Sequence, residues 1–238
     1  MSPAEHLKEL KNRTLICLVL LVVVFVLFYV NKDSIMSMAL GIGTDAGFEF
    51  IYKAPQALFM QQLKLCIIMS LIVALPVFVY HALAFVLPAF DAKVRTVFIP
   101  AIVSYGLFLV GVYTSYRWFI PFIMSFLCNA GINLANVSST VSVEDYLVFF
   151  TGLLMAVGII FEIPLVSALL CNVGILRSST MRKGRKLVTV LALVVSAIIT
   201  PPDVLSQIIV AFPILLLYEL SIMLCRMIEI RKVRRNKL

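Results

Sequence analysis

The sequence predicts an all-α integral membrane protein with six transmembrane helices. Of its 238 residues, 62% are hydrophobic and only 13% are charged, and the mean hydropathy is +1.08. A soluble domain has no core large enough to hide that apolar fraction, whereas a helix that crosses a bilayer needs about 20 consecutive apolar residues. The apolar runs define six spans, at about 14–30, 65–87, 97–118, 146–173, 187–200 and 204–225. We expect the whole chain, 1–238, to form a single membrane domain.

The first span follows a basic tail and is expected to be a retained helix rather than a cleaved secretory signal. Its apolar run is longer than the core of a usual signal, and no Ala-x-Ala-like cleavage site follows it. The tail places Glu5, Glu9 and Arg13 at helical spacing beside an apolar edge, which is typical of an interfacial helix.

The basic residues orient the spans. Sixteen of the 20 Lys and Arg residues precede span one, follow span six, or lie in the connections from span two to three and from span four to five. Because Lys and Arg prefer cytoplasmic loops, both termini are predicted to be cytoplasmic. Anchoring against anionic lipid then explains the net charge of +8 better than binding to nucleic acid does.

The two longest outer connections are predicted to carry some structure. The first, about 31–64, is punctuated by glycines and Pro55 and becomes amphipathic from about Gln56, which predicts an interfacial helix leading into span two. The second, about 119–145, is expected to begin as a continuation of span three. On the inner side, Pro88 marks a turn between spans two and three.

Span five is unusually short. The 14 residues between Lys186 and Pro201 cover roughly 21 Å, whereas the hydrocarbon core is about 30 Å thick. The outer turn that follows, Pro201, Pro202 and Asp203, is tight and suits the start of span six. Spans five and six are therefore predicted to form a short helical hairpin, and either the membrane thins beside span five or neighbouring helices shelter it.

Three polar residues inside the last spans are candidates for function. Glu162 lies midway along span four, where an ionised acid costs roughly 2.5 to 3.5 kcal/mol, so a bundle interior or a wet cavity is its expected place. Pro164 removes a helical hydrogen bond and predicts a kink beside it. Gln207 and Glu219 lie in span six, and Glu219 is expected to be a second buried acid. A neutral Glu162 that serves only packing is the alternative.

No catalytic or metal-binding set is present in the sequence. The only histidines are His6 and His81, the five cysteines are scattered singly, and no Gly-rich phosphate loop or hydrolase motif occurs. We therefore expect no enzyme activity, no metal and no cofactor. Energy for any transport has to come from a partner or from the membrane gradients.

Four stretches together resemble the TatC family, the multispanning core of the twin-arginine protein translocase. They are "HLKELKNR" (6–13), "YHALAFVLPAFDAKVR" (80–95), "FEIP" (161–164) and "ITPPDVLSQIIVAFPILLLYE" (199–219). They occur in the right order over essentially the whole chain. The resemblance implies a cupped bundle in the bacterial inner membrane that acts as a receptor for signal peptides with paired arginines. It also implies TatA- and TatB-type single-span partners, homo-oligomers within the complex, and export of folded proteins driven by the proton motive force.

The resemblance also assigns roles to residues. An acid of the N-terminal motif, here Glu9, is expected to bind the arginine pair, with Lys11 beside it. The family's second acid falls on Val94, just before Arg95, so this chain departs from the pattern, and Asp91 one helical turn earlier is the candidate substitute. Glu162, Gln207 and Glu219 are expected to contact a partner helix or an inserted signal peptide.

One further function remains open from composition alone. A proton-coupled small-solute transporter would use Glu162 as its proton site. The two halves of the chain share no visible internal similarity that would support an inverted repeat.

Overall fold

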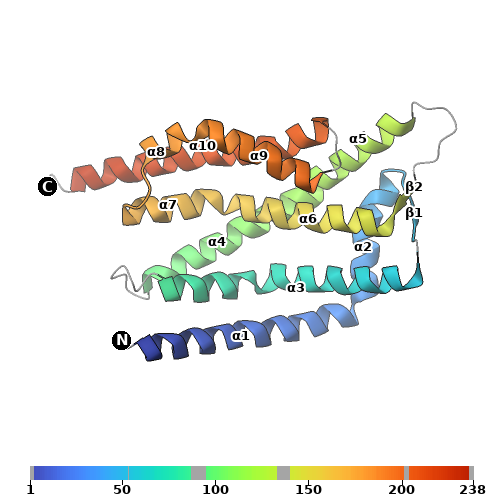
Figure 1. Cartoon of the computed structure of the whole chain (residues 1–238), viewed down its shortest axis with the longest axis horizontal. Coiled ribbons are helices and arrows are strands. Elements are labelled where there is room, and N and C mark those ends of the chain that lie inside the picture. Colours follow the sequence, from blue (N-terminus) through green and yellow to red (C-terminus); the bar gives the residue numbers. More distant parts are fainter. Residues whose placement is uncertain (1–2, 53, 87–94, 133–139, 201–203, 236–238) are drawn as a thin grey trace. The chain divides into compact units, whose positions relative to one another are not determined.

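The structure is a computed structural model whose backbone is described for residues 3–52, 54–86, 95–132, 140–200 and 204–235 (Figure 1). The chain divides into two compact units, Met1–Tyr105 with Ile120–Met155, and Gly106–Phe119 with Ala156–Leu238. The helices α4 (Arg95–Thr114) and α6 (Val143–Phe161) contribute residues to both. Nearly all regular structure in the described part is helical, as the sequence predicts.

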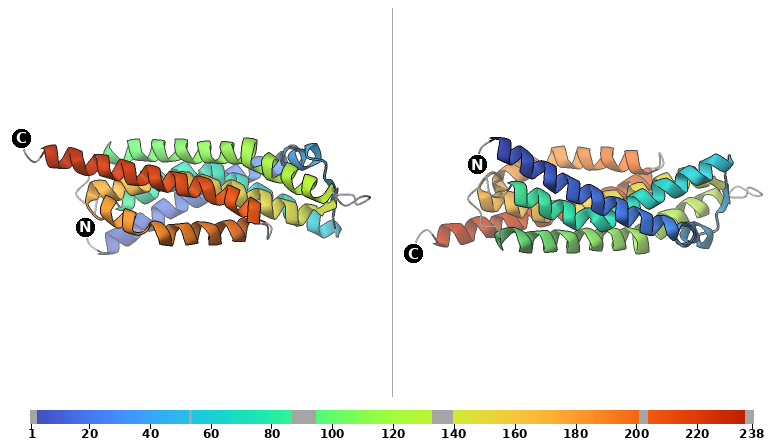
Figure 2. Two further views of the ribbon diagram at one scale, coloured as in Figure 1. Left: turned by 90° about the horizontal axis from the view of Figure 1, so that it is seen from above. Right: turned by 90° about the horizontal axis from the view of Figure 1, so that it is seen from below.

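The first unit is built on two long antiparallel helices. These are α1 (Pro3–Val30) and α3 (Pro55–Val86), which pack side by side (Figures 1 and 2). Many apolar side chains of α1 are exposed, among them Val22, Val26 and Leu27, which suits a helix surrounded by lipid. The N-terminal end of α1 lies beside the C-terminal end of α3 (Figure 1).

The connection after α1, which is predicted to lie on the outer side, holds a helix that the sequence analysis missed. This helix, α2 (Lys32–Asp45), buries Met36, Ala39 and Gly43, which recur on one face at helical spacing. The Tyr146 hydroxyl of α6 donates a hydrogen bond of 2.6 Å to the Ala39 carbonyl. The absence of a side chain at Gly43 lets the Phe50 ring pack against this helix, since a Cβ there would lie 2.4 Å from the ring.

Two short strands also escaped prediction, so the fold is not purely α-helical. The strands β1 (Glu49–Ile51) and β2 (Thr140–Ser142) pair in parallel, with Glu49 opposite Thr140. Between α2 and β1 the chain turns at Gly47, whose φ of 97° lies in the left-handed region that glycine tolerates. The amphipathic stretch expected from Gln56 is helical, but it forms the first turns of α3 rather than a separate helix, and Pro55 opens α3.

Span three continues beyond its predicted end, as expected for the start of the second outer segment. The helix α4 is followed without a break by a π-helical turn, η2 (Ser115–Phe119), and then by α5 (Ile120–Ile132). A π turn accommodates one extra residue in a helix, and it occurs here at the cluster of aromatic residues around Trp118.

The second unit is organised around one long helix, α10 (Val204–Arg235). It packs against α7 (Ile163–Val173), the short α8 (Ser178–Lys183) and α9 (Arg185–Ile199) (Figure 2). Its core joins Ile160, Ala192, Ala211, Ile214 and Leu217 from α6, α9 and α10. The 15 residues of α9 confirm the short fifth helix that the sequence predicts, because they cover only about 22 Å.

Five stretches of the described residues are long and apolar enough to cross a membrane. They are Lys11–Val30, Gln56–Leu75, Ile102–Cys128, Val143–Val173 and Val204–Lys232. They make the chain a multi-pass membrane protein. At 15 residues α9 is too short to be included by length, so a count of six spans stays a prediction.

Candidate functional site

Glu162 lies at a break in the fourth span, where the sequence predicts a kink. The helix α6 ends at Phe161 and α7 begins at Ile163, with Pro164 in the first turn of α7. The side chain of Glu162 is half-buried, and its Oε1 atom is shielded from solvent. The residue occupies the N-cap position of α7, so the acid lies where the helix of the fourth span is interrupted.

Gln207 ties together the two helices of the short hairpin. Its side-chain amide donates a hydrogen bond of 2.7 Å to the Leu193 carbonyl of α9. At the C-cap of α9, the Thr200 hydroxyl donates a hydrogen bond to the Ser196 carbonyl at 2.8 Å. These bonds place polar groups along one end of the α9–α10 hairpin. The turn predicted at Pro201, Pro202 and Asp203 lies outside the described residues.

The side chain of Glu219 is more exposed than the sequence predicts. Its carboxylate forms an ion pair of 2.7 Å with the guanidinium of Arg185, and the two side chains are 43% and 51% exposed, respectively. The expectation of a buried acid is therefore wrong, because Arg185 begins α9 close enough to pair with Glu219 at the surface of the unit.

The sequence analysis missed Glu229, which holds the connection between α7 and α8. Its carboxylate accepts hydrogen bonds from the Ser178 amide at 2.8 Å and the Ser178 hydroxyl at 2.5 Å. The amine of Lys232, one turn further along α10, donates to the Asn172 carbonyl near the end of α7. The sequence feature that could have pointed to Glu229 is its position as the single acid in the basic run "CRMIEIRKVRR".

The residues expected to bind a signal peptide are only partly described. Glu9 lies within α1, and Lys11 follows it with an exposed side chain. Arg95 is the first residue of α4. Asp91 and Val94, like Pro88, lie outside the described residues. The fold brings the start of α1 and the end of α3 to one end of the first unit, so the tail and the connection that follows α3 start from neighbouring points (Figure 1).

The cysteines have a packing role. All five are free and buried, and the Cys225 thiol donates a hydrogen bond to the Ser167 carbonyl at 3.3 Å. Within the part of the chain that the structure describes, no three His, Cys, Asp or Glu side chains come together in a way that could hold a metal ion.

Comparisons with known proteins agree on one family. A family model described as Sec-independent protein translocase protein (TatC) matches residues 5–213. The Sec-independent protein translocase protein TatC of Escherichia coli (strain K12) is 35% identical over 225 residues, which cover 93% of this chain and 86% of that protein. TatCy of Bacillus subtilis (strain 168) is 33% identical, with 95% of this chain and 89% of that protein covered.

Solved structures are similar over nearly the whole fold. A crystal structure of the twin arginine translocase receptor TatC superimposes with a TM-score of 0.85 at 28% identity, covering 94% of this chain and 99% of that one. A second, of the same receptor in DDM, gives a TM-score of 0.82 at 29% identity and covers 92% and 98% of the two chains. The break at Glu162, the short α9 and the match over most of the sequence thus have one explanation: the chain belongs to the TatC family of Sec-independent protein translocase proteins.

Proposed function

We propose that this chain is the receptor and core subunit of a twin-arginine translocase. It binds signal peptides with paired arginines at the cytoplasmic face of a bacterial inner membrane and assembles with TatA- and TatB-type single-span proteins. The complex exports folded proteins at the expense of the proton motive force. The observation that carries this proposal is the family match over residues 5–213, together with solved relatives that are themselves described as receptors.

The peptide-binding patch is proposed at the end of the first unit where α1 begins and α3 ends. Glu9 supplies a carboxylate that can pair bidentately with a guanidinium, a strong and directional contact. Asp91 provides the second negative charge in place of the absent acid at Val94. Lys11 and Arg95 border the patch and orient the peptide backbone. The packing of α1 against α3 supports this arrangement, because the N-terminal tail and the connection after α3 adjoin neighbouring ends of these two helices.

A second contact surface is proposed within the membrane, on residues of the second unit. Glu162 beside the helix break, Gln207 on the α9–α10 hairpin and Glu219 with its Arg185 partner offer polar groups to a partner helix or to the apolar part of a signal peptide. In this proposal α9 is the fifth of six spans and both termini are cytoplasmic. Several copies of the chain assemble in the active complex.

Photo-crosslinking tests the receptor function. A photoreactive amino acid replaces Glu9, Asp91 or Val94 in the membrane-embedded chain, and labelled signal peptides carrying Arg-Arg or Lys-Lys are compared. We expect crosslinks from these positions to favour the Arg-Arg peptide. A probe at Thr140, in β2, serves as the control and should crosslink neither peptide. Equal crosslinking of both peptides by a folded chain would refute the proposal.

A further inference from the structure

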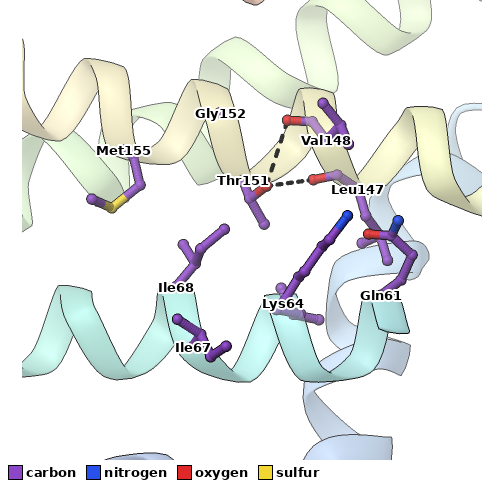
Figure 3. Close-up of a pocket in the computed structure, with 10 residues that line it drawn as sticks. Gln61, Lys64, Ile67, Ile68, Leu147, Val148, Thr151, Gly152 and Met155 are labelled. Carbon is purple, nitrogen blue, oxygen red and sulfur yellow. Dashed lines mark hydrogen bonds between the residues drawn. The ribbon is translucent and has the colours of Figure 1, made fainter. Parts of the chain in front are cut away.

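A cavity in the first unit has no role in the function proposed above. It measures about 450 Å³ and lies between α3 and α6 (Figure 3). Its walls include Ile67 and Ile68 from α3 and Val148, Thr151 and Met155 from α6. The volume falls within the range of about 300–1,000 Å³ typical of small-molecule sites.

The α6 wall is apolar although it contains a threonine. The Thr151 hydroxyl donates a hydrogen bond of 2.6 Å to the Leu147 carbonyl, so its hydrogen-bonding capacity is used within the helix (Figure 3). Next to it, Gly152 has no side chain, and a Cβ built there would meet nothing within 4 Å. The hollow therefore exists in part because residue 152 is a glycine.

One end of the cavity is polar. Lys64 extends from α3 towards α6, and the amide side chain of Gln61, only 6% exposed, lies beside it (Figure 3). In the described part of the chain, no acidic side chain forms an ion pair with Lys64. Lys64 is exposed, so its amine can pair with an anion from outside the chain.

We propose that this cavity binds one acyl chain of an anionic phospholipid, with the lipid phosphate on Lys64 and Gln61. The chain of the lipid fills the apolar part along Ile68, Thr151 and Met155, and the headgroup supplies the missing negative charge. A partner helix fits less well, because a 20-residue helix occupies on the order of 2,000 Å³. A soluble anion would leave the apolar length of the cavity empty.

Two substitutions separate the two parts of the proposed site. Gly152→Leu places a side chain in the hollow, where a Cβ meets nothing within 4 Å, and should displace the acyl chain of any lipid. Lys64→Gln removes the charge and should abolish only the preference for an anionic headgroup. The matched controls are Gly106→Leu, where a Cβ also meets nothing within 4 Å, and Lys32→Gln, whose amine lies over the Tyr29 ring.

Photolabelling in vesicles tests the site. The full chain is reconstituted in phosphatidylcholine vesicles that contain phosphatidylglycerol or phosphatidylcholine with a diazirine in one acyl chain, and crosslinked residues are mapped by mass spectrometry. We expect the phosphatidylglycerol probe to label the α3 and α6 residues of the cavity about five- to tenfold more than the phosphatidylcholine probe, consistent with one lysine–headgroup contact. Gly152→Leu should lower labelling by both probes, and Lys64→Gln should make them equal.

Specific outcomes would overturn the proposal. Unchanged labelling of Gly152→Leu would show that the acyl chain lies elsewhere, and equal labelling by both probes in the unmodified chain would show that Lys64 selects no headgroup. A photoreactive residue at Val148 that crosslinks a single-span partner or a signal peptide instead of lipid would assign the cavity to a helix. The vesicle assay involves no signal peptide, so its result is independent of the receptor function.

Discussion

At Gly111, the backbone of α4 lies close to the backbone of α6 within the second unit. A Cβ at this position would lie 2.9 Å from the Val157 carbonyl oxygen and 3.0 Å from the Cα atom of Gly158. Both neighbours are backbone atoms, which cannot move aside as the end of a side chain can. The small residue is therefore required by the packing of two helices.

Gly111→Ala should destabilise the protein, because the helices have to separate to admit the methyl group. Overpacking of this kind costs about 1–3 kcal/mol. Gly106→Ala, in the same helix but with open space around it, should be neutral or stabilise by up to about 1 kcal/mol, since alanine favours a helix. Thermal unfolding of both variants in detergent measures the difference, and equal melting temperatures would contradict this account of the packing.

Glu162→Gln tests whether the charge at the helix break serves transport. The variant keeps the side-chain size and the neighbouring Pro164, so we expect normal accumulation in the membrane. Export should slow by roughly tenfold, equivalent to about 1.4 kcal/mol of lost contact with a partner or peptide. Export of a folded reporter is the measurement. Loss of the protein from the membrane would instead assign Glu162 to packing.

The helix α9 corresponds to a predicted span, but it is shorter than the thickness of a bilayer requires. Its 15 residues cover about 22 Å, against about 30 Å of hydrocarbon. Buried Ala192 and Ser196 are one turn apart and fix the face of α9 that packs in its unit. A short helix held in this way favours local thinning of the membrane, which would lower the barrier to a passenger protein.

Adding four leucines to the outer end of α9 should impair export while leaving the fold intact. The insertion adds about 6 Å and slightly more than one turn, so the packed face keeps its direction. The same insertion near the outer end of α1, which already has a candidate span of 20 residues, is the control. Unchanged export by the lengthened α9 would argue against membrane thinning as part of the mechanism.

The elements differ in how well sequence predicts them. The break at Glu162 and the short α9 follow from local chemistry, since Pro164 lacks a backbone N–H and Lys186 bounds the apolar run. The strands were missed because three-residue segments have no usable periodicity and their partners are far away in sequence. The helix α2 was missed because its glycines, serines and threonine weaken an apolar pattern that is clear only once Met36, Ala39 and Gly43 are seen to be buried.

At the scale of the whole molecule, orientation in the membrane can be tested with single cysteines. The five native cysteines are buried, so background labelling should be low. Thr140→Cys, within the predicted outer segment, should react with an impermeant maleimide in intact cells, whereas Thr180→Cys, within the basic connection between α7 and α9, should react only after permeabilisation. The opposite pattern would reverse the proposed topology.

Contacts between segments far apart in the chain could not be predicted from the sequence alone. The family and the mainly helical class were predictable, and membership of the TatC family leaves the solute-transporter interpretation of Glu162 without support. Arg185 with Glu219 and Ser178 with Glu229 are contacts between helices whose relative positions no local pattern encodes. The expectation that Glu219 is buried failed for this reason.

The parallel pairing of β1 with β2 has a consequence for biogenesis. Glu49 cannot meet Thr140 until the ribosome has added about 90 further residues, a wait of roughly 5 to 18 seconds at normal rates of synthesis. During that interval α3, α4 and α5 are synthesised, and β1 has no partner strand. The two strands can therefore pair only after α5 has been made, so this part of the fold is completed later than the helices between the strands.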